Sequence, residues 1–410
     1  MTTSRRSFLG AAAAGAGLAA AATGRTTAAQ GNAVVPPATR DQIPTPALLL
    51  DLDRFEANLK TLNDQCRATG RNARPHAKTH KCPEIARRQV AAGAVGVSVA
   101  TVPEAEAMAA GGIKSLLLTS PILDPRKAAR MAAIAKSGVE VLIAVGHPDE
   151  VPLLESAAAA SGVKLDTLLD LDVGDARFGI PPGDAALALA RRLASAQGLR
   201  LRGVQAYAGL SSHVRGFDAR EKSTRENMGK AVAMRRRLEQ AGLITGAPIL
   251  SGGSTGTYNI DTTIDGVTEL QSGSYVFMDV GYMRIGGRDG AALYTDFRPS
   301  LSVLTTVVST SHPDRATLDA GIKAFSTDTE DAPEPVDHPG YHYRRFGDEF
   351  GLLTADPGVA LPKLGERLAF YVPHCDPTVY LYDRIHAMRG DRVEGIWPIA
   401  ARREWEPSST

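Results

Sequence analysis

This 410-residue chain has few aromatic residues, only three cysteines and almost no net charge. Aromatic residues make up 5% of it, which argues against a surface that stacks on nucleic-acid bases. The 46 basic and 45 acidic residues leave a net charge of +1, so no global field attracts nucleic acid. Three cysteines at unpatterned spacing predict no disulfide framework. We therefore expect a small molecule as partner and no nucleic acid.

Long hydrophobic runs are also scarce, and the longest lies near the N-terminus. Arg5 and Arg6 precede an apolar stretch of mostly Ala and Gly at residues 8–22, and small residues follow it. The order Ser-Arg-Arg-x-Phe-Leu resembles a twin-arginine export signal. We expect residues 1–30 to be a signal peptide, the mature protein to be periplasmic, and no membrane association after its removal. A disordered Ala-rich tail or an uncleaved anchor is the alternative.

From residue 46 to about residue 270, candidate strands alternate with candidate helices. Short apolar runs such as 94–100, 115–119 and 140–145 are each followed by a segment of helical length. Strands in this arrangement pair in parallel through right-handed crossovers. About eight such units predict a (β/α)8 TIM-type barrel over residues 31–290, of which the first residues are alternatively part of a second domain. A doubly wound open sheet is the main competitor, but its usual glycine fingerprint is absent after the first strand.

The pattern changes after residue 290. Short segments rich in Val, Leu, Tyr and Thr, such as 298–310, 366–372 and 392–397, are separated by Gly and Pro. This texture is typical of antiparallel sheets, and we predict a C-terminal antiparallel β domain over residues 291–410. The acidic, Pro-containing stretch 326–339 is expected to form an exposed loop.

The densest group of chemically active side chains is RPHAKTHK at residues 74–81. We expect Lys78 at the end of the second barrel strand, where barrel enzymes carry their catalytic residues. In an extended strand, His76, Lys78 and His80 share one face. A lysine whose pKa is lowered by neighbouring cations can attack an aldehyde and form a Schiff base. A solvated basic loop is the alternative interpretation.

The motif Arg-Pro-His-x-Lys-Thr-His-Lys follows Thr-Pro-x-Leu-x-Leu-Asp at residues 45–51, and the two together resemble the D-threonine aldolase and D-serine dehydratase-like enzymes. The resemblance runs from about residue 45 to residue 397. It implies an alanine racemase-type barrel that binds pyridoxal 5'-phosphate (PLP). It also implies that Lys78 is the lysine that joins the cofactor and that His76 lies beside it.

Three further segments at expected strand ends are candidates for the cofactor site. Residues 172–179 (DVGDARFG) hold an arginine between glycines, and residues 251–257 (SGGSTGT) and 271–275 (QSGSY) are turns of small residues. Such turns let backbone N–H groups approach a phosphate, and the last two strands are where barrels usually hold one. Structural turns are the alternative. The resemblance implies that the cofactor ring is lined by Arg177, Gln205 and Tyr207 and the phosphate by Gly253, Ser254, Thr255, Gly273, Ser274 and Tyr275.

The segment PHCD at residues 373–376 is a candidate metal site. In an extended chain, His374 and Asp376 share a face and Cys375 points away. One imidazole and one carboxylate suit Mn or Mg, with Zn as an alternative, and leave open positions for catalysis. A turn or a hydrogen-bonded pair is the non-metal interpretation. The resemblance implies a divalent metal site here, with His-x-Cys typical of the dehydratases and His-x-Asp of the aldolases.

His213 lies on an expected barrel-top loop, where a histidine is a natural proton acceptor near neutral pH. A solvated loop histidine is the alternative. By the resemblance, it acts as the base toward the substrate hydroxyl. The family likeness implies a homodimeric, PLP- and metal-dependent lyase that cleaves small 3-hydroxy D-amino acids to glycine and an aldehyde. A D-serine or 3-hydroxy-D-aspartate dehydratase, an amino-acid racemase and a non-catalytic PLP carrier are the alternatives.

Overall fold

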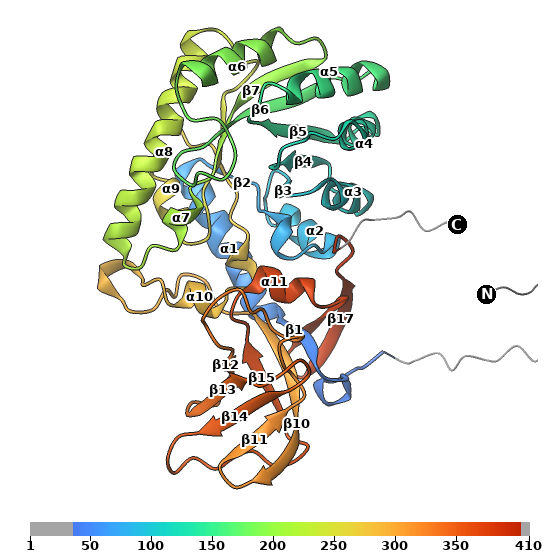
Figure 1. Ribbon diagram of the computed structural model, residues 1–410, viewed down its shortest axis with the longest axis vertical. Helices are drawn as coiled ribbons and strands as arrows, with labels where there is room; N and C mark the ends of the chain where they lie inside the picture. Colours follow the sequence, from blue (N-terminus) through green and yellow to red (C-terminus); the bar gives the residue numbers. More distant parts are fainter. Residues whose placement is uncertain (1–35, 403–410) are drawn as a thin grey trace, which may run out of the picture. The chain divides into compact units, whose positions relative to one another are not determined.

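The computed structural model describes residues 36–402, and the predicted signal peptide at 1–30 lies outside this range. The described chain forms two sheets (Figure 1). One is an eight-stranded parallel sheet that curls into a barrel, and the other is a nine-stranded, mostly antiparallel sheet. The predicted fold class, a parallel barrel with an additional antiparallel sheet, is confirmed.

The barrel strands follow one another around the sheet and are all parallel. They are β2 (Asn72–Ala73), β3 (Val97–Val99), β4 (Ser115–Leu118), β5 (Glu140–Val145), β6 (Leu165–Leu171), β7 (Leu199–Ala206), β8 (Ile249–Gly252) and β9 (Glu269–Leu270). The last strand pairs with β2, and a bridge between His76 and Ser98 connects the β2 side to β3. The ring therefore closes, and its carboxyl ends meet at one mouth.

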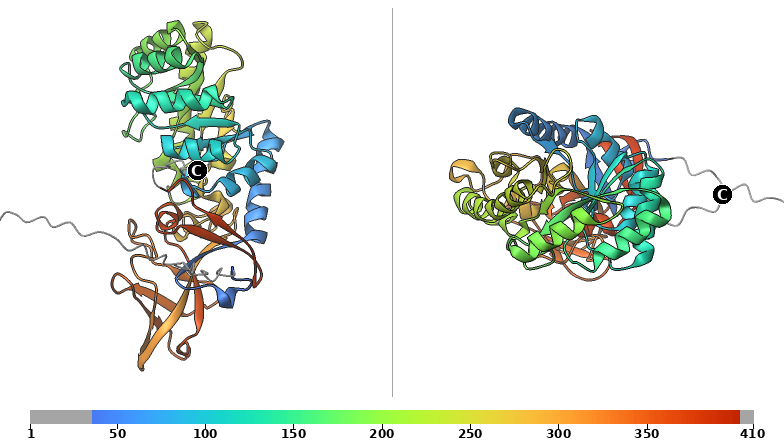
Figure 2. Two further views of the ribbon diagram at one scale, coloured as in Figure 1. Left: turned by 90° about the vertical axis from the view of Figure 1, so that its right-hand side faces the viewer. Right: turned by 90° about the horizontal axis from the view of Figure 1, so that it is seen from above.

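Helices cover the outside of the barrel, as the view from above in Figure 2 shows. They are α1 (Leu52–Thr69), α2 (Pro83–Ala91), α3 (Val102–Ala110), α4 (Pro125–Lys136), α5 (Glu150–Ser161), α6 (Asp184–Ser195) and α8 (Phe217–Gln240). Their starts carry the expected signals: Asp124 accepts a hydrogen bond from the Arg126 backbone, and Thr101 accepts one from that of Glu104. Most residues of the ring strands are buried on both faces, because helices cover one face and the barrel interior the other.

The second sheet contains strands from both ends of the described chain. They are β1 (Ala47–Asp51), β10 (Leu301–His312), β11 (Arg315–Leu318), β12 (Glu334–Pro335), β13 (Tyr341–Arg345), β14 (Gly351–Ala355), β15 (Arg367–Tyr371), β16 (Arg384–Arg389) and β17 (Arg392–Pro398). Strand β1 pairs with β10 and β16 and not with the barrel. Its run of four buried apolar residues suits either sheet, so the sequence pattern alone did not decide its partner.

Because β1 is not part of the barrel, β2, the strand before Lys78, is the first barrel strand. The prediction that Lys78 follows the second barrel strand is therefore wrong. The second sheet also carries the short helix α11 (Cys375–Tyr380), which lies against the 3-10 turn η2 (Ala77–Thr79) below the barrel mouth (Figure 1). Elements more than 290 residues apart in sequence thus meet at one place. This contact brings the second sheet to the edge of the cofactor region.

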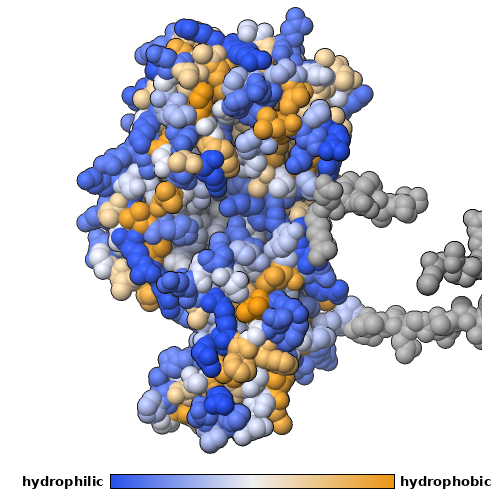
Figure 3. Space-filling model, in the orientation of Figure 1, coloured by the Kyte–Doolittle hydropathy of each residue, from blue (hydrophilic) through white to orange (hydrophobic). Residues whose placement is uncertain are grey.

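Within residues 36–402, no helix is both long enough and apolar enough to cross a membrane. On the face drawn in Figure 3, hydrophilic side chains predominate and apolar ones form small groups among them.

Candidate active site

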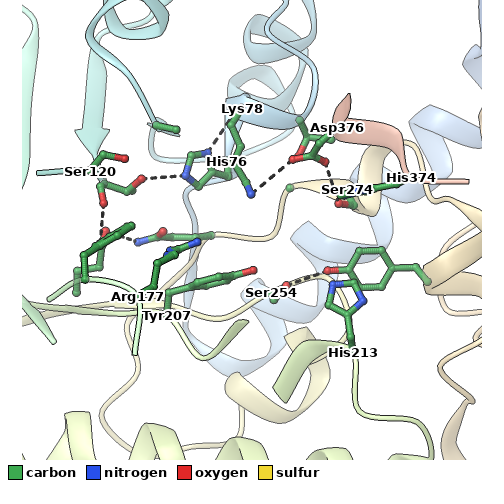
Figure 4. Close-up of a pocket in the computed structure, with 18 residues that line it drawn as sticks. His76, Lys78, Ser120, Arg177, Tyr207, His213, Ser254, Ser274, His374 and Asp376 are labelled. Carbon is green, nitrogen blue, oxygen red and sulfur yellow. Dashed lines mark hydrogen bonds and ion pairs between the residues drawn. The ribbon is translucent and has the colours of Figure 1, made fainter. Parts of the chain in front are cut away.

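A cavity of about 290 Å³ lies where the barrel mouth meets helix α11. Eleven of the residues singled out from the sequence line it (Figure 4): His76, Lys78, Arg177, Gln205, Tyr207, His213, Ser254, Gly273, Ser274, His374 and Asp376. Gly253, Thr255 and Tyr275, also predicted, are not among its lining residues. The structure therefore gathers side chains from both sheets around one space.

Lys78 is in the turn η2 and not in a strand, so the predicted shared face of His76, Lys78 and His80 is wrong. His80 is fully buried and hydrogen-bonded to Gln89, 3.2 Å away, outside the cavity. His76 does line the cavity, where its Nε2 is 3.1 Å from Thr119 Oγ1. Side chains in a 3-10 turn do not alternate as they do in a strand, so these residues do not share one face. Burial lowers the pKa of His76 well below its ordinary value.

The ammonium of Lys78 lies 3.5 Å from Asp376 Oδ1 across the cavity (Figure 4). The carboxylate of Asp376 raises the pKa of Lys78, although burial acts against this. The expectation that nearby cations lower the pKa of this lysine is therefore wrong for the protein in this form. The sequence near Lys78 could not show this, because Asp376 is almost 300 residues away in helix α11. No local motif indicates that the two side chains meet.

Arg177 lies over the ring of Tyr207, with 5.4 Å between the guanidinium carbon and the ring centroid, and 4.3 Å from that of Phe178. The loop that carries Arg177 turns back sharply to β6. The close approach is seen at Gly179, where an added Cβ would lie 2.8 Å from the backbone nitrogen of Asp172. A cation held over aromatic faces gains about 0.5–2 kcal/mol. This positions a planar cation and a planar ring on one side of the cavity, an arrangement that suits a flat heteroaromatic cofactor.

Each of the two small-residue turns packs closely against a neighbouring segment. A Cβ at Gly273 would lie 2.5 Å from Thr79 Oγ1, and one at Gly252 would lie 2.1 Å from the carbonyl oxygen of Ala206. Glycine is therefore required at both places. Among residues 36–402, Thr255 Oγ1 and Ser272 Oγ are buried and have no hydrogen-bond partner. Unpartnered hydroxyls beside glycine-rich backbone at adjacent strand ends fit a phosphate group.

Tyr275 does not offer its side chain to this region. It is fully buried, its hydroxyl accepts a hydrogen bond from Gln89, and its ring packs on Phe297 at 5.6 Å. Only its backbone can reach a phosphate. The turn η3 (Ser274–Val276) begins at this point, and N–H groups at the start of a helical turn have no partner inside it.

His213 follows the short helix α7 (Gly209–Ser212) and faces the cavity. Its ring packs on Tyr282, with 4.5 Å between centroids. Burial lowers its pKa, so the neutral ring, which can accept a proton, is favoured. Tyr282 was not singled out from the sequence, because no motif or spacing marks it.

The opposite wall of the cavity is formed by His374 and Asp376. The segment is not extended as predicted: His374 precedes α11, and Asp376 lies in its first turn. Both side chains still reach the cavity, and Cys375 between them is fully buried. Burial lowers the pKa of His374, but the carboxylates of Asp279, Asp376 and Asp328 outweigh it and raise that pKa.

His374 donates a hydrogen bond from Nδ1 to Asp328 Oδ2 at 2.6 Å, which leaves Nε2 for the cavity. Histidines that bind metals usually donate their other ring nitrogen in this way. Within the described range, no cluster of three or more His, Cys, Asp or Glu side chains could hold a metal ion. His374 and Asp376 are the two side chains of these types that line this wall.

Comparisons with known proteins identify the family of this chain. A family model described as alanine racemase, N-terminal domain, matches residues 50–280, and one described as putative serine dehydratase domain matches residues 300–388. The chain is 36% identical to a D-threonine aldolase from an Arthrobacter species, over 91% of this chain and 97% of the relative. It belongs to the D-threonine aldolase and D-serine dehydratase-like family.

Other members of this family support the assignment. A 3-hydroxy-D-aspartate aldolase from Paracoccus denitrificans (strain Pd 1222) is 34% identical over 90% of this chain and 94% of the relative. The crystal structure of D-threonine aldolase from Filomicrobium marinum superimposes with a TM-score of 0.83 at 35% identity, covering 89% of this chain and 97% of that one. A D-threo-3-hydroxyaspartate dehydratase from Delftia sp. (strain HT23) is 29% identical over 86% of this chain and 96% of its own. The predicted family is confirmed.

Proposed function

We propose that the protein is a PLP-dependent lyase that cleaves the Cα–Cβ bond of 3-hydroxy D-amino acids, releasing glycine and an aldehyde. The observation that carries the proposal is the placement of Lys78 opposite Asp376, 3.5 Å apart, in one cavity formed by both sheets. The similar aldolases, at 34–36% identity over most of the chain, support the same reaction class.

The barrel side of the cavity fits PLP. Lys78 would hold the cofactor covalently, and Arg177 and Tyr207 would face its ring. The phosphate would be held at two turns by Gly253, Ser254, Thr255, Gly273, Ser274 and Tyr275. When bound, PLP supplies an electron sink for the pair released from the broken bond.

His374 and Asp376 would hold a divalent metal ion, Mn or Mg, with Zn as the alternative. Such an ion supplies Lewis acidity toward the 3-hydroxyl group of the substrate. The hydrogen bond from His374 to Asp328 supports this, because it fixes the imidazole with Nε2 available. One solved D-threo-3-hydroxyaspartate dehydratase relative is described as a metal-free form, which also supports a metal in this family.

His213 would remove the proton from the substrate hydroxyl. Its lowered pKa keeps the ring neutral at neutral pH, and its packing on Tyr282 limits its rotation. As this proton leaves, the hydroxyl carbon becomes the aldehyde carbonyl and the Cα–Cβ bond breaks, and Cα then takes up one proton to give glycine. In this proposal His213 starts the cleavage from a loop separate from both cofactor turns.

A dehydratase is the second candidate, because a D-threo-3-hydroxyaspartate dehydratase is 29% identical over most of the chain. On the same scaffold, β-elimination would release water and finally ammonia and a 2-oxo acid. This chain has Asp at position 376, which makes the motif His-x-Asp and favours the aldolase. His-x-Cys is the motif that the family resemblance gives to the dehydratases. If the protein were a racemase or a PLP carrier, the cavity wall formed by His374 and Asp376 would have no role.

The products decide between these reactions. Mature protein with PLP and Mn²⁺ is given D-threonine, and glycine plus acetaldehyde are assayed against ammonia plus 2-oxobutyrate. We expect glycine and acetaldehyde in equal amounts, and none from L-threonine. Ammonia and 2-oxobutyrate as the main products would establish a dehydratase instead.

Two further features belong to the proposal. The twin-arginine-like segment at residues 1–30 supports export of the folded, cofactor-loaded protein to the periplasm. The family likeness supports a homodimer. Fractionation of cells and light scattering of the mature protein test these two points separately from the reaction.

A further inference from the structure

Arg220 in helix α8 is completely buried, although it carries a charge. Its guanidinium donates hydrogen bonds to the carbonyl oxygens of Gly256 at 2.8 Å, Val214 at 3.0 Å, Ile285 at 2.9 Å and Gly286 at 2.8 Å. All of these partners are backbone atoms. A single side chain therefore joins three segments that are far apart in the sequence.

Each of the three segments adjoins a part of the site. Gly256 is in the turn proposed to hold the phosphate, and Val214 directly follows His213. Ile285 and Gly286 follow helix α10 (Val280–Met283), which carries Tyr282, the residue that packs on His213. Arg220 thus connects the phosphate turn, the histidine and the residue beneath the histidine. Helix α8 itself contributes no lining residue to the cavity.

A second connection joins the same parts by hydroxyl groups. Ser212 Oγ donates to Ser254 Oγ at 2.8 Å, and the Tyr282 hydroxyl lies 3.1 Å from Ser212 Oγ and 3.2 Å from Ser254 Oγ. The two loops also touch directly, since a Cβ at Gly256 would lie 2.2 Å from the carbonyl oxygen of Ser212. The loops therefore have no room to move independently.

The choice of arginine at this buried position follows from geometry. Only a guanidinium offers five donors in one plane, so that it can reach four carbonyl groups at once. The cost is a charge removed from water: the hydrogen bonds of the guanidinium all go to carbonyl oxygens, and the rings of Tyr294 and Phe217 lie beside it. Burial lowers the pKa of Arg220, and the carboxylate of Asp296 offsets only part of this effect. A phosphate bound to the turn that Arg220 holds would bring negative charge toward this cation and offset part of that cost.

We infer that Arg220 is a positioning residue that couples the phosphate turn to the loop of His213, so that binding of a phosphate group fixes the proton acceptor in place. This inference rests on the proposed function for its effect on turnover. The coupling itself is a property of the fold and is measurable without turnover.

The test compares Arg220→Lys, which keeps the charge but cannot bond four carbonyls, with Arg225→Lys as a matched control. Arg225 lies on the same helix, is exposed and pairs with Glu221. We expect Arg220→Lys to bind PLP at least about tenfold more weakly and, at saturating PLP and Mn²⁺, to lower kcat about tenfold or more while KM stays within about twofold. The control should match the wild type in all three.

A second readout needs no substrate. Diethyl pyrocarbonate modifies accessible histidines, and mass spectrometry reports the rate at His213. In wild-type apoprotein, saturating inorganic phosphate should slow modification of His213, because the phosphate turn then orders its loop. In Arg220→Lys the rate should not respond to phosphate. If the wild type fails to cleave D-threonine, the proposed function fails while this readout still tests the coupling.

Wild-type PLP affinity, kcat and phosphate response in Arg220→Lys would overturn the inference, even if the variant melted at a lower temperature. If Arg220→Lys does not fold, Ser212→Ala takes its place. That variant removes the hydroxyl connection and leaves every carbonyl bond of Arg220 intact. It should keep most of the phosphate response at His213, and loss of that response would show that the hydroxyl groups and not Arg220 couple the two loops, which would overturn the inference.

Discussion

The two walls of the cavity are built in different ways. The barrel wall presents Lys78, Arg177 and Gly273 on turns that follow hydrogen-bonded strands, so its shape is set largely by backbone. The opposite wall presents His374 and Asp376 at the start of a six-residue helix, where side chains set its chemistry. A backbone cradle suits a cofactor that many enzymes share, whereas a few exchangeable side chains suit the choice of reaction.

Two family models meet at this division: one described as alanine racemase, N-terminal domain, matches residues 50–280, and one described as putative serine dehydratase domain matches residues 300–388. We therefore expect changes on the barrel wall to abolish cofactor binding, and changes on the second wall to spare the cofactor and abolish the reaction.

Replacing Lys78 by Ala breaks the barrel wall and should have the largest effect. We expect activity to fall by about 10³-fold or more, because the covalent link to the cofactor is lost. The absorbance of the bound cofactor should disappear together with the activity. Lys323→Ala, a surface lysine paired with Glu349, is the control and should retain both. Retained cofactor absorbance in the Lys78 variant would contradict the assignment of the lysine.

Replacing His213 by Gln tests the residue between the two walls. Loss of the proton acceptor should lower kcat by about 10²–10⁴-fold. PLP absorbance and Mn²⁺ affinity should stay at the wild-type level, since His213 holds neither group in this account. Steady-state kinetics with cofactor and metal titrations separate the effects. A variant with unchanged kcat would show that another group takes the proton.

Replacing Asp328 by Asn sharpens the comparison, because it touches only the second wall. Loss of the carboxylate that orients His374 should weaken Mn²⁺ binding by about 10–100-fold. PLP affinity should not change. Asp331→Asn in the same loop, where the acid pairs with Arg284 on the surface, is the matched control. Isothermal titration with Mn²⁺ measures both variants, and equal affinities would remove Asp328 from the site.

The pH profile should show the smallest effect. Burial lowers the pKa of His213 below the ordinary 6.5, so the neutral ring persists as the pH falls through that value. The acidic limb of kcat/KM should therefore lie below pH 6.5 and be absent from the residual activity of His213→Gln. A limb at or above that pH would contradict the lowered pKa of His213.

Local pattern was sufficient for much of this molecule. The alternation of strands and helices predicted the barrel, and three residues of the small-residue turns, Ser254, Gly273 and Ser274, do line the cavity at its mouth. Contacts between the two sheets were not predictable: β1 pairs with β10 and β16, and Asp376 changes the surroundings of Lys78. Hydrophobic periodicity shows which face of a strand or helix is buried, but it does not show which other element packs against that face.

Functional side chains that belong to no sequence motif were not predicted, for the same reason. Asp328 lies in an acidic loop where several carboxylates are equivalent in sequence, and only the fold brings it to His374. Arg220 reads as one more charged residue of a polar helix, yet it is fully buried. In the opposite direction, His80 had the right spacing for the cavity, and the turn at residues 77–79 directs it into the core.

The most direct test of the two-wall account is to strip the metal from the holoenzyme. EDTA is added while cofactor absorbance and glycine formation from D-threonine are recorded in the same sample, and Mn²⁺ is then restored. The account predicts that glycine formation stops, that the absorbance of bound PLP is unchanged, and that Mn²⁺ restores activity. Full activity in excess chelator, or loss of the cofactor together with the metal, would contradict it.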